Sequence, residues 1–306
     1  MKPIAFLFPG QGSQYVGMGK EFYENFNTAR QIFEEADDTL RLSISELCFK
    51  GPEEALTLTE NTQPAVLTMS IAALKVLQTE KGMTPQFTAG HSLGEYSALV
   101  ASGAFTFSDA VKIVRLRGKF MQEAVPVGEG TMAAILGMEL EQVEKICKEV
   151  SLGEILTPAN INCPGQIVIA GHSKAIERAI EKVKQEGKKA IILPVSAPFH
   201  SPLMKPAGDR LEKALEEIPV SDLKIPVITN VDAEVNHLKD RVRGLLVAQV
   251  SNPVRWEESM RKMIEKGIEQ VLEIGPGRVL SGLMKRINNH IETKNLEDLQ
   301  SLRKIS

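Results

Sequence analysis

The stretch AGHSLGEYSA (residues 89–98) sets a serine between two glycines and directly after a histidine. The pattern predicts a short apolar strand before it, QFTAG (86–90), and a helix after it, LGEYSALVAS (93–102). A strand, a tight turn and a helix around G-x-S-x-G form a nucleophile elbow, whose glycines let neighbouring backbone pass close by. The stretch therefore predicts an α/β fold with Ser92 presented above a sheet, although a serine that only caps the helix fits the same pattern.

Alternating strands and helices are predicted on both sides of this stretch. The strands are IAFLF (4–8), QFTAG (86–90), IPVITNV (225–231) and QVLEIGPG with its turn (270–277), and the helices cover 61–80, 93–102, 108–124 and a segment from about 239. This order is typical of a mostly parallel sheet with helices on both faces. We expect the polar tail from Asn288 onward to lie at the periphery.

The middle of the chain has a different order of elements. Strands are predicted at 131–138, 155–162, 166–171 and 189–195, with helices at 140–150 and 173–187. The order βαββαβ is that of a ferredoxin-like unit. We therefore predict a ferredoxin-like small domain, 128–196, inserted into a large α/β catalytic domain formed by 1–127 and 197–306.

Composition and charge exclude several classes of function. The 306 residues carry a formal net charge of −3, which gives no reason to expect nucleic acid as a partner, since its binding needs a basic face. No apolar run is long enough for a signal peptide or a membrane span. The three cysteines are far apart, lack metal-ligand spacing and indicate buried, reduced residues. We expect a cytoplasmic protein, monomeric by default, that binds neither nucleic acid nor a membrane.

A serine nucleophile needs a general base, and the chain has five histidines. His91 is adjacent to Ser92, but neighbouring side chains at a tight turn point apart, so we expect His91 to line the pocket or pack beside it. His200 follows a predicted strand and lies between Pro198 and Pro202, which stiffen its loop. His200 is the candidate base, with a buried structural histidine as the alternative.

Acyl chemistry also needs donors for an oxyanion. The backbone N–H of Leu93, which follows the serine at a helix N-terminus, is one candidate. A second donor is expected from the loop PGQGSQ (9–14) after the first strand. The glycines of this loop lack the spacing of G-x-G-x-x-G, so the sequence does not favour a nucleotide cofactor.

One arginine lies where an apolar residue is expected. In the helix 108–124, Arg117 falls in the middle of the apolar stripe formed by Ala110, Ile113, Val114 and Met121. A buried guanidinium must be paired. Its partner is either an internal Asp or Glu or the carboxylate of a substrate, which arginine binds through two parallel hydrogen bonds.

Ordered motifs along nearly the whole chain resemble one family. They are FPGQGSQ (8–14), TQPA (62–65), GHSLGEYSA (90–98), RGKFMQEAVP (117–126), NCPGQIVIAG (162–171), FHSPLMKPA (199–207), NPVRW (252–256) and GPGRVLSGL (275–283). Together they closely resemble the acyltransferase family of the malonyl-CoA:acyl-carrier-protein transacylases of fatty acid and polyketide synthesis. The resemblance implies a hydrolase-like α/β large domain together with the ferredoxin-like small domain.

The resemblance also implies roles for matched residues. Ser92 would carry the acyl group and His200 would be its base. The N–H groups of Gln11 and Leu93 would form the oxyanion hole. Arg117 would bind the free carboxylate of the malonyl group.

Three further roles come from the same resemblance. Gln63 and Asn160 would line the pocket. Because no obvious acid completes a triad, a backbone carbonyl near Gln249 would orient the histidine. Phe199 matches the pattern of malonyl-selective relatives.

The implied enzyme is a ping-pong S-malonyltransferase with coenzyme A thioester and acyl carrier protein as partners. Exchange of one thioester for another is nearly balanced in energy, so no metal or other cofactor is expected. Lys285 and Arg286 are candidates for docking the acidic carrier protein, or they form an ordinary solvated face. A serine thioesterase or hydrolase with the same Ser–His pair is the main alternative, and a non-catalytic carrier-protein-binding relative is a second.

Overall fold

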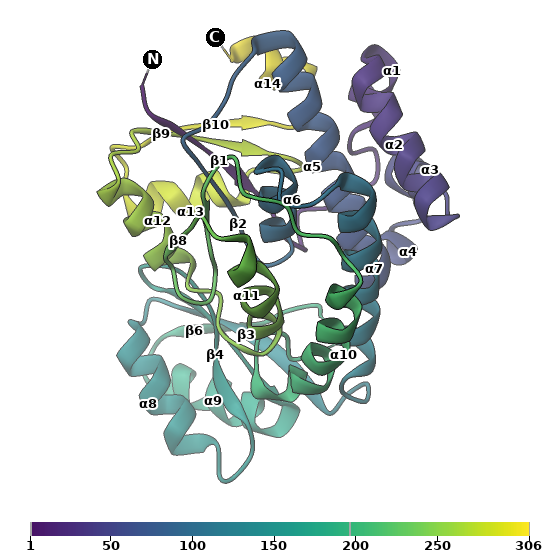
Figure 1. Ribbon diagram of the computed structural model, residues 1–306. Coiled ribbons are helices and arrows are strands. Elements are labelled where there is room, and N and C mark those ends of the chain that lie inside the picture. Colours follow the sequence, from purple (N-terminus) through teal and green to yellow (C-terminus); the bar gives the residue numbers. More distant parts are fainter. Residues whose placement is uncertain (1, 196, 306) are drawn as a thin grey trace.

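The computed structural model describes residues 2–195 and 197–305, which form two sheets with helices around them (Figure 1). One sheet has six strands in the order β10-β9-β1-β2-β7-β8, and the other has four in the order β4-β5-β3-β6. The first is mostly parallel and the second is antiparallel. This arrangement confirms the predicted fold class.

The strands of the large sheet follow the predicted order, with one addition. They are β1 (Ile4–Phe8), β2 (Phe87–Gly90), β7 (Val227–Ile228), β8 (Val235–Asn236), β9 (Gln270–Ile274) and β10 (Glu292–Leu296). Only β8 runs antiparallel to its neighbour, β7. The predicted strand 225–231 is reduced to the two residues of β7, because the chain turns at residues 230–232 and comes back as β8.

The expectation that the tail is peripheral was wrong. Residues after Asn288 form β10, which pairs in parallel with β9 along its whole length. Leu296 and Leu302 are buried there. The polar sequence of β10 hides this role, since ladder hydrogen bonds are made by the backbone and an edge strand needs little apolar surface.

Helices surround the large sheet, and several of them were not assigned from the sequence. They are α1 (Lys20–Asn25), α2 (Asn27–Leu40), α3 (Ile44–Lys50), α4 (Glu53–Thr57), α5 (Thr59–Lys81), α6 (Gly94–Ala101), α7 (Phe107–Glu123), α10 (Lys205–Glu216), α11 (Lys239–Ser251), α12 (Trp256–Glu265), α13 (Val279–Ile287) and α14 (Leu299–Lys304), and a 3₁₀ turn spans Pro202–Met204. The helices α1 to α4, α10, α12 and α14 were not assigned from the sequence.

Alternate side chains of β1 face two different layers of helices. Phe6 and Phe8 belong to the core cluster that includes residues of α2, α5, α6 and α7. Ala5 and Leu7 belong to the cluster formed with α12 and α13. Because successive strand residues point to opposite faces, this alternation places β1 in the middle of a sheet that is covered on both sides.

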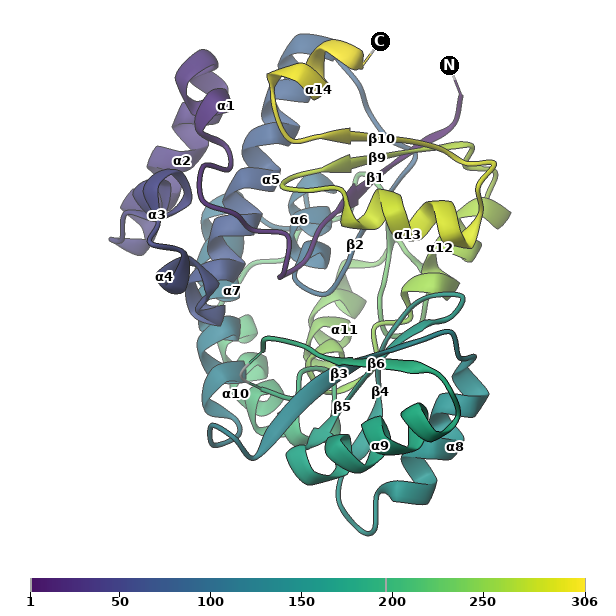
Figure 2. The ribbon, with the colours of Figure 1, turned by 180° about the vertical axis from the view of Figure 1, so that it is seen from behind.

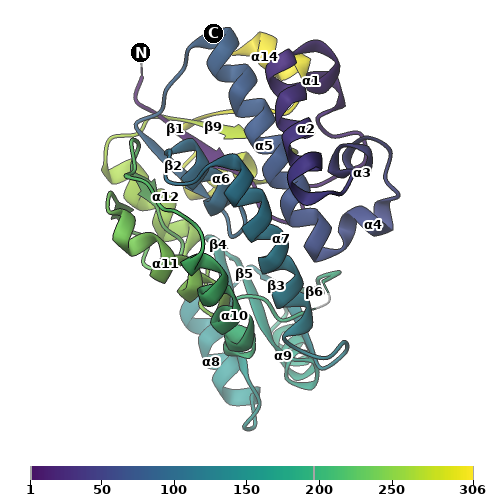
Figure 3. The ribbon, with the colours of Figure 1, turned by 45° about the vertical axis from the view of Figure 1, so that its right-hand side comes forward.

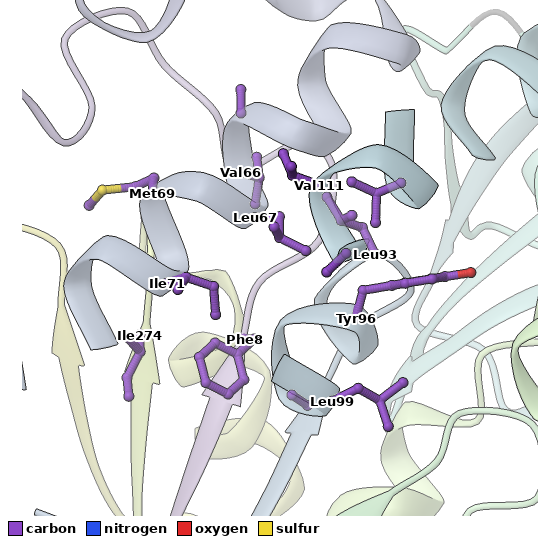
Figure 4. Close-up of a cluster of buried hydrophobic side chains, with 14 of the residues drawn as sticks. Phe8, Val66, Leu67, Met69, Ile71, Leu93, Tyr96, Leu99, Val111 and Ile274 are labelled. Atoms are coloured by element: carbon purple, nitrogen blue, oxygen red, sulfur yellow. The ribbon is translucent and has the colours of Figure 1, made fainter. Parts of the chain in front are cut away.

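The larger cluster is formed by buried hydrophobic side chains where α5 and α6 lie on the sheet (Figure 4). Ile71 from α5 and Phe8 from β1 lie close together, and Leu67 from α5 and Leu99 from α6 belong to the same cluster; each of the four is at most 2% exposed. Burial of this kind supplies about 1.5–3 kcal/mol per large apolar side chain. The cluster fixes the position of α6 and hence of the turn before it.

The small sheet is the predicted ferredoxin-like unit. It contains β3 (Gly130–Leu136), β4 (Leu156–Cys163), β5 (Gln166–His172) and β6 (Lys189–Ile192), with α8 (Leu140–Val150) and α9 (Ser173–Gln185). The two helices cover the face that points away from the large sheet (Figure 2). The other face carries Met132 and Val168, which join the core of the large part.

Backbone pairing joins the small sheet to the large part. Val254 N–H donates to Ala159 O at 2.9 Å, and Ile161 N–H donates to Val254 O at 2.9 Å. In Figure 3, α7 extends past both sheets with α10 beside it. The small sheet is thereby held near the carboxyl ends of β1 and β2, where open α/β sheets bind ligands.

All three cysteines are free and buried, as predicted. No helix within residues 2–195 and 197–305 combines the length and the apolar character needed to cross a membrane.

Candidate active site

Ser92 lies in a strained turn between β2 and α6. Its φ angle is 51°, in the left-handed region that residues with side chains rarely adopt. A Cβ on Gly90 would lie 1.9 Å from the Gly94 backbone, and one on Gly94 would lie 2.0 Å from Phe8 O. The two glycines of GHSLG are therefore required by the close approach of β1, β2 and α6, and the predicted elbow is present.

Asn230, which follows β7, braces this turn from the neighbouring strand. Its Oδ1 accepts a hydrogen bond from Ser92 N–H at 2.7 Å, and its Nδ2 donates to Gly90 O at 2.8 Å. The asparagine thus satisfies backbone groups that the strained turn leaves without helix or strand partners. Sequence reasoning missed Asn230, and its only local signal is a polar residue at the end of a predicted strand.

Ser92 and His200 are in direct contact. Ser92 Oγ and His200 Nε2 are 2.7 Å apart, and His200 Nδ1 is 2.8 Å from Gln249 O. A carbonyl oxygen only accepts, so Nδ1 carries the proton and Nε2 is free to accept from the serine. The carbonyl of Gln249 thus occupies the place that an acid has in a triad.

Burial and, after it, the charge of the nearby Arg117 lower the pKa of His200 to about 3, against the opposing effect of the hydrogen bond to Gln249. His200 is 3% exposed, and its backbone φ angle is 58°. It is neutral at pH 7 and able to accept a proton. His200 lies in the loop that follows β6, and β6 ends at Ile192, earlier than predicted. A hydrogen bond from Ser201 Oγ to Pro198 O at 2.6 Å stiffens this loop.

Arg117 is buried beside the serine. It is 1% exposed, and its Nη2 donates to Ser92 Oγ at 3.1 Å and to Gln249 Oε1 at 2.8 Å, while Nη1 donates to Gln63 Oε1 at 2.8 Å. These acceptors are all neutral, and no ion pair forms with an Asp or Glu of the described residues. The sequence left two partners open for Arg117, an internal carboxylate or the carboxylate of a substrate. Among the described residues, no internal carboxylate pairs with it.

A cavity of about 110 Å³ lies over this group. Its lining combines the predicted residues with an apolar wall: Gln11, Gln63, His91, Ser92, Leu93, Arg117, Met121, Met132, Asn160, Leu193, Val195, Phe199 and His200. It shares Gln11, Asn160 and Val195 with a second cavity of about 490 Å³ that reaches α4 and α13. The small space suits a short acyl group and the larger one an extended chain.

Two backbone donors border the small cavity. Within residues 2–195 and 197–305, neither Gln11 N–H nor Leu93 N–H donates a hydrogen bond. Gly10 makes the approach of this loop possible, since a Cβ there would lie 2.5 Å from His91 O. Two N–H groups without protein partners at the edge of a serine site are the elements of an oxyanion hole.

The remaining histidine beside the serine has a packing role. His91 Nε2 is 2.9 Å from Asn162 Oδ1, and its ring lies against Trp256 with centroids 5.4 Å apart. Burial lowers the pKa of His91. His91 lines both cavities, as expected. No cluster of His, Cys, Asp and Glu suited to a metal ion is found among the described residues.

The fold and the Ser92–His200 pair define a class of α/β proteins in which a serine on a strand-to-helix turn contacts a histidine. The family model described as the acyl transferase domain matches residues 5–300. The chain belongs to this acyl transferase family.

Individual relatives are similar over their whole length. A malonyl CoA-acyl carrier protein transacylase of Bacillus subtilis is 53% identical over 99% of this chain and 96% of its own. The crystal structure of such a transacylase from Clostridium perfringens has a TM-score of 0.95 and 47% identity, covering 99% and 95% of the two chains. The solved complex of a type II PKS acyl-carrier protein with its malonyl-transacylase also contains a similar chain. Its TM-score is 0.96 and its identity 47%, and the match covers 99% of this chain and 98% of that one.

Proposed function

We propose that this chain is a malonyl-CoA:acyl-carrier-protein S-malonyltransferase of fatty acid synthesis. It moves a malonyl group from malonyl-CoA to the phosphopantetheine thiol of acyl carrier protein through a malonyl ester of Ser92. The family, the names of its relatives and the solved complex with a carrier protein support this function.

In the first half of the reaction, Ser92 Oγ attacks the thioester carbonyl and its proton passes to His200 Nε2. The N–H groups of Gln11 and Leu93 stabilise the oxyanion of the tetrahedral intermediate. When the intermediate collapses, the C–S bond breaks and the CoA thiolate takes the proton from His200. The Gln249 carbonyl holds the imidazole in the required tautomer and stabilises its charged form.

The second half runs the same steps with a new thiol. His200 takes the proton of the phosphopantetheine thiol, the sulfur attacks the ester, and Ser92 recovers its proton as the C–O bond breaks. A thioester is exchanged for a thioester, so the reaction needs no metal, nucleotide or redox cofactor. Gln63 and Asn160 border the acyl group in the small cavity.

The observation that carries this proposal is the environment of Arg117. A buried guanidinium that contacts Ser92 Oγ and has only neutral hydrogen-bond partners is suited to a carboxylate on the acyl group. A thioesterase for ordinary acyl groups has no use for such a cation. Malonyl is a short acyl group with a terminal carboxylate, and it fits a cavity of about 110 Å³.

Intact mass spectrometry after brief incubation with malonyl-CoA tests the function. We expect a malonyl adduct on the parent that holo acyl carrier protein discharges, and no adduct on Ser92→Ala. Release of CoA and malonate without an adduct would instead indicate the hydrolase. An inert Ser92, shown by failure to react with a fluorophosphonate probe, would indicate a non-catalytic relative.

We also propose that the protein acts in the cytoplasm as a monomer. Three free, buried cysteines suit a reducing compartment. All of the proposed site residues come from one chain, and no second copy is needed to complete the site.

A further inference from the structure

Glu95 is a buried carboxyl group to which the reaction above gives no role. It lies in the first turn of α6 and is 2% exposed. Its Oε2 accepts hydrogen bonds from Gln249 Nε2 at 2.7 Å and from Asn230 N–H at 3.1 Å. Both donors belong to residues that also hold Ser92 or His200 in place. A carboxyl group rarely stays buried unless it is specifically paired, so its place beside the site calls for a reason.

The side chain of Gln249 connects Glu95 to Arg117. Its Nε2 donates to Glu95, and its Oε1 accepts from Arg117 Nη2 at 2.8 Å. An ionised carboxylate can only accept, so it determines which end of the amide faces it. The other end, the oxygen, must then face the guanidinium. One neutral side chain thus fixes the orientation of the hydrogen bonds between Glu95 and the residue that contacts Ser92 Oγ.

The titratable groups around Glu95 lie on its own helix and on three other elements. Burial is the main cause that raises the pKa of Glu95 to about 7. The hydrogen bonds from Gln249 and Asn230 and the charge of Arg117 on α7 oppose this rise, and Asp232 in the turn after β7 adds to it. Tyr96 is adjacent on α6, and burial raises the pKa of its hydroxyl well above the usual range. His200, reached through Gln249, has a pKa of about 3. Glu95 is therefore the group in this set that changes its charge near neutral pH.

We propose that Glu95 is a positioning residue that sets, through Gln249, how strongly Arg117 holds the carboxylate of the acyl group. The inference rests on the proposed function. An ionised Glu95 partly offsets the charge of Arg117 across the Gln249 side chain and repels the incoming acyl carboxylate. Its charge therefore weakens the hold of Arg117 enough for the acyl group to leave with the carrier protein. Loss of that charge strengthens the hold, and the effect is confined to acyl groups with a carboxylate.

The test variant is Glu95→Gln, whose amide oxygen still accepts from Gln249 and Asn230 while the charge is removed. Glu273→Gln is the matched control. Glu273 is also fully buried with a pKa raised by burial, but its carboxylate accepts from Leu280 N–H at 2.9 Å and Ser281 N–H at 2.8 Å, away from Arg117. Both variants lose one buried charge, and only one of the two charges is linked to the site.

The readout is the half-saturating malonyl-CoA concentration in single-turnover acylation of Ser92, beside the same measurement with acetyl-CoA. At pH 8.5 we expect Glu95→Gln to lower the half-saturating concentration of malonyl-CoA about tenfold and to leave that of acetyl-CoA unchanged. At pH 6, where Glu95 of the parent is itself protonated, parent and variant should converge. Glu273→Gln should match the parent at both pH values.

A purely structural Glu95 gives a different pattern. Equal losses with both thioesters, or a difference from the parent that is the same at pH 6 and pH 8.5, would overturn the proposal. If Glu95→Gln does not fold, the parent protein provides the test. Its half-saturating concentration of malonyl-CoA, divided by that of acetyl-CoA, must be lower at pH 6 than at pH 8.5. A parent that forms no malonyl adduct at all would contradict the proposed function instead, and the two failures are thus distinguishable.

Discussion

The apolar cluster of Figure 4 and the polar centre around Ser92 are built on the same helices, but different forces hold them together. From α6, Leu99 enters the cluster and Glu95 enters the polar centre. From α7, Val111 enters the cluster and Arg117 the polar centre. Each helix therefore carries structure on one side and chemistry on the other.

The two regions differ in whether their interactions depend on direction. Apolar contacts depend on area and shape, so the cluster needs side chains of about the right volume. The polar centre needs a partner for every donor and acceptor, at the right distance and angle. A change of volume should therefore damage the cluster, whereas a change of one atom type should damage the centre.

The largest effect is expected for Arg117→Met, which keeps much of the side-chain volume and removes the cation. Loss of one partner of a buried charge pair costs about 3–5 kcal/mol, so acylation by malonyl-CoA should fall by two to three orders of magnitude. Acylation by acetyl-CoA, which has no carboxylate, should fall far less. Single-turnover mass spectrometry with both thioesters measures the ratio.

Arg115→Met is its control on the same helix. Arg115 lies on the other side of α7 and donates to Asn61 Oδ1 at 3.0 Å. Its loss should leave the ratio of the two substrates unchanged. Equal losses for both substrates in Arg117→Met would show that the guanidinium has no preference for a carboxylate.

The apolar cluster is tested by Leu67→Ala. Leu67 is fully buried on α5, and truncation of such a leucine lowers the free energy of unfolding by about 2–5 kcal/mol. Malonyl-to-acetyl selectivity should stay that of the parent, because no polar contact changes. Urea unfolding measures the free energy of unfolding, and single-turnover acylation measures the malonyl-to-acetyl selectivity.

Leu116→Ala is the exposed counterpart, since Leu116 is 40% exposed on α7. It should change the unfolding free energy by less than about 0.5 kcal/mol. A loss of selectivity in Leu67→Ala would mean that the cluster and the polar centre are not independent.

The smallest effect concerns acid. Burial holds the pKa of His200 at about 3 in the folded protein, against an ordinary value of 6.5. Below pH 6.5 the unfolded chain binds a proton that the folded chain does not, so folding stability falls as the pH falls toward 3. Between pH 6.5 and pH 5 this group should cost about 2 kcal/mol. His200→Asn should lack this contribution, so its free energy of unfolding relative to the parent should rise as the pH falls from 6.5 to 5.

Glu95 acts in the opposite direction. Its raised pKa of about 7 makes the folded chain bind the extra proton, so its contribution grows as the pH falls from 7 toward 4.5. Urea unfolding of the parent, His200→Asn and Glu95→Gln at several pH values separates the two terms. An unchanged difference between the parent and His200→Asn at pH 6.5 and pH 5 would mean that His200 is not buried as a neutral group.

Much of this arrangement was predictable because its causes are local. The glycines around Ser92 predicted a tight turn, and periodicity alone placed Arg117 on a buried stripe. The βαββαβ order predicted the small sheet from the sequence of its elements. These features depend on residues a few positions apart, where strand and helix periods apply.

The tertiary structure alone decided the partners. Asn230 meets Ser92 across 138 positions, and Gln249 meets Glu95 across 154. No periodicity connects residues that far apart, and a polar residue at a strand end or on a helix has many possible partners. The polar tail became β10 for a similar reason, since its backbone hydrogen bonds with β9 do not depend on its side chains. The sequence by itself determined the elements, the serine and the buried cation, because these follow from local sterics and burial. Only the packing of β2, β7, α6 and α11 decided which polar atoms meet.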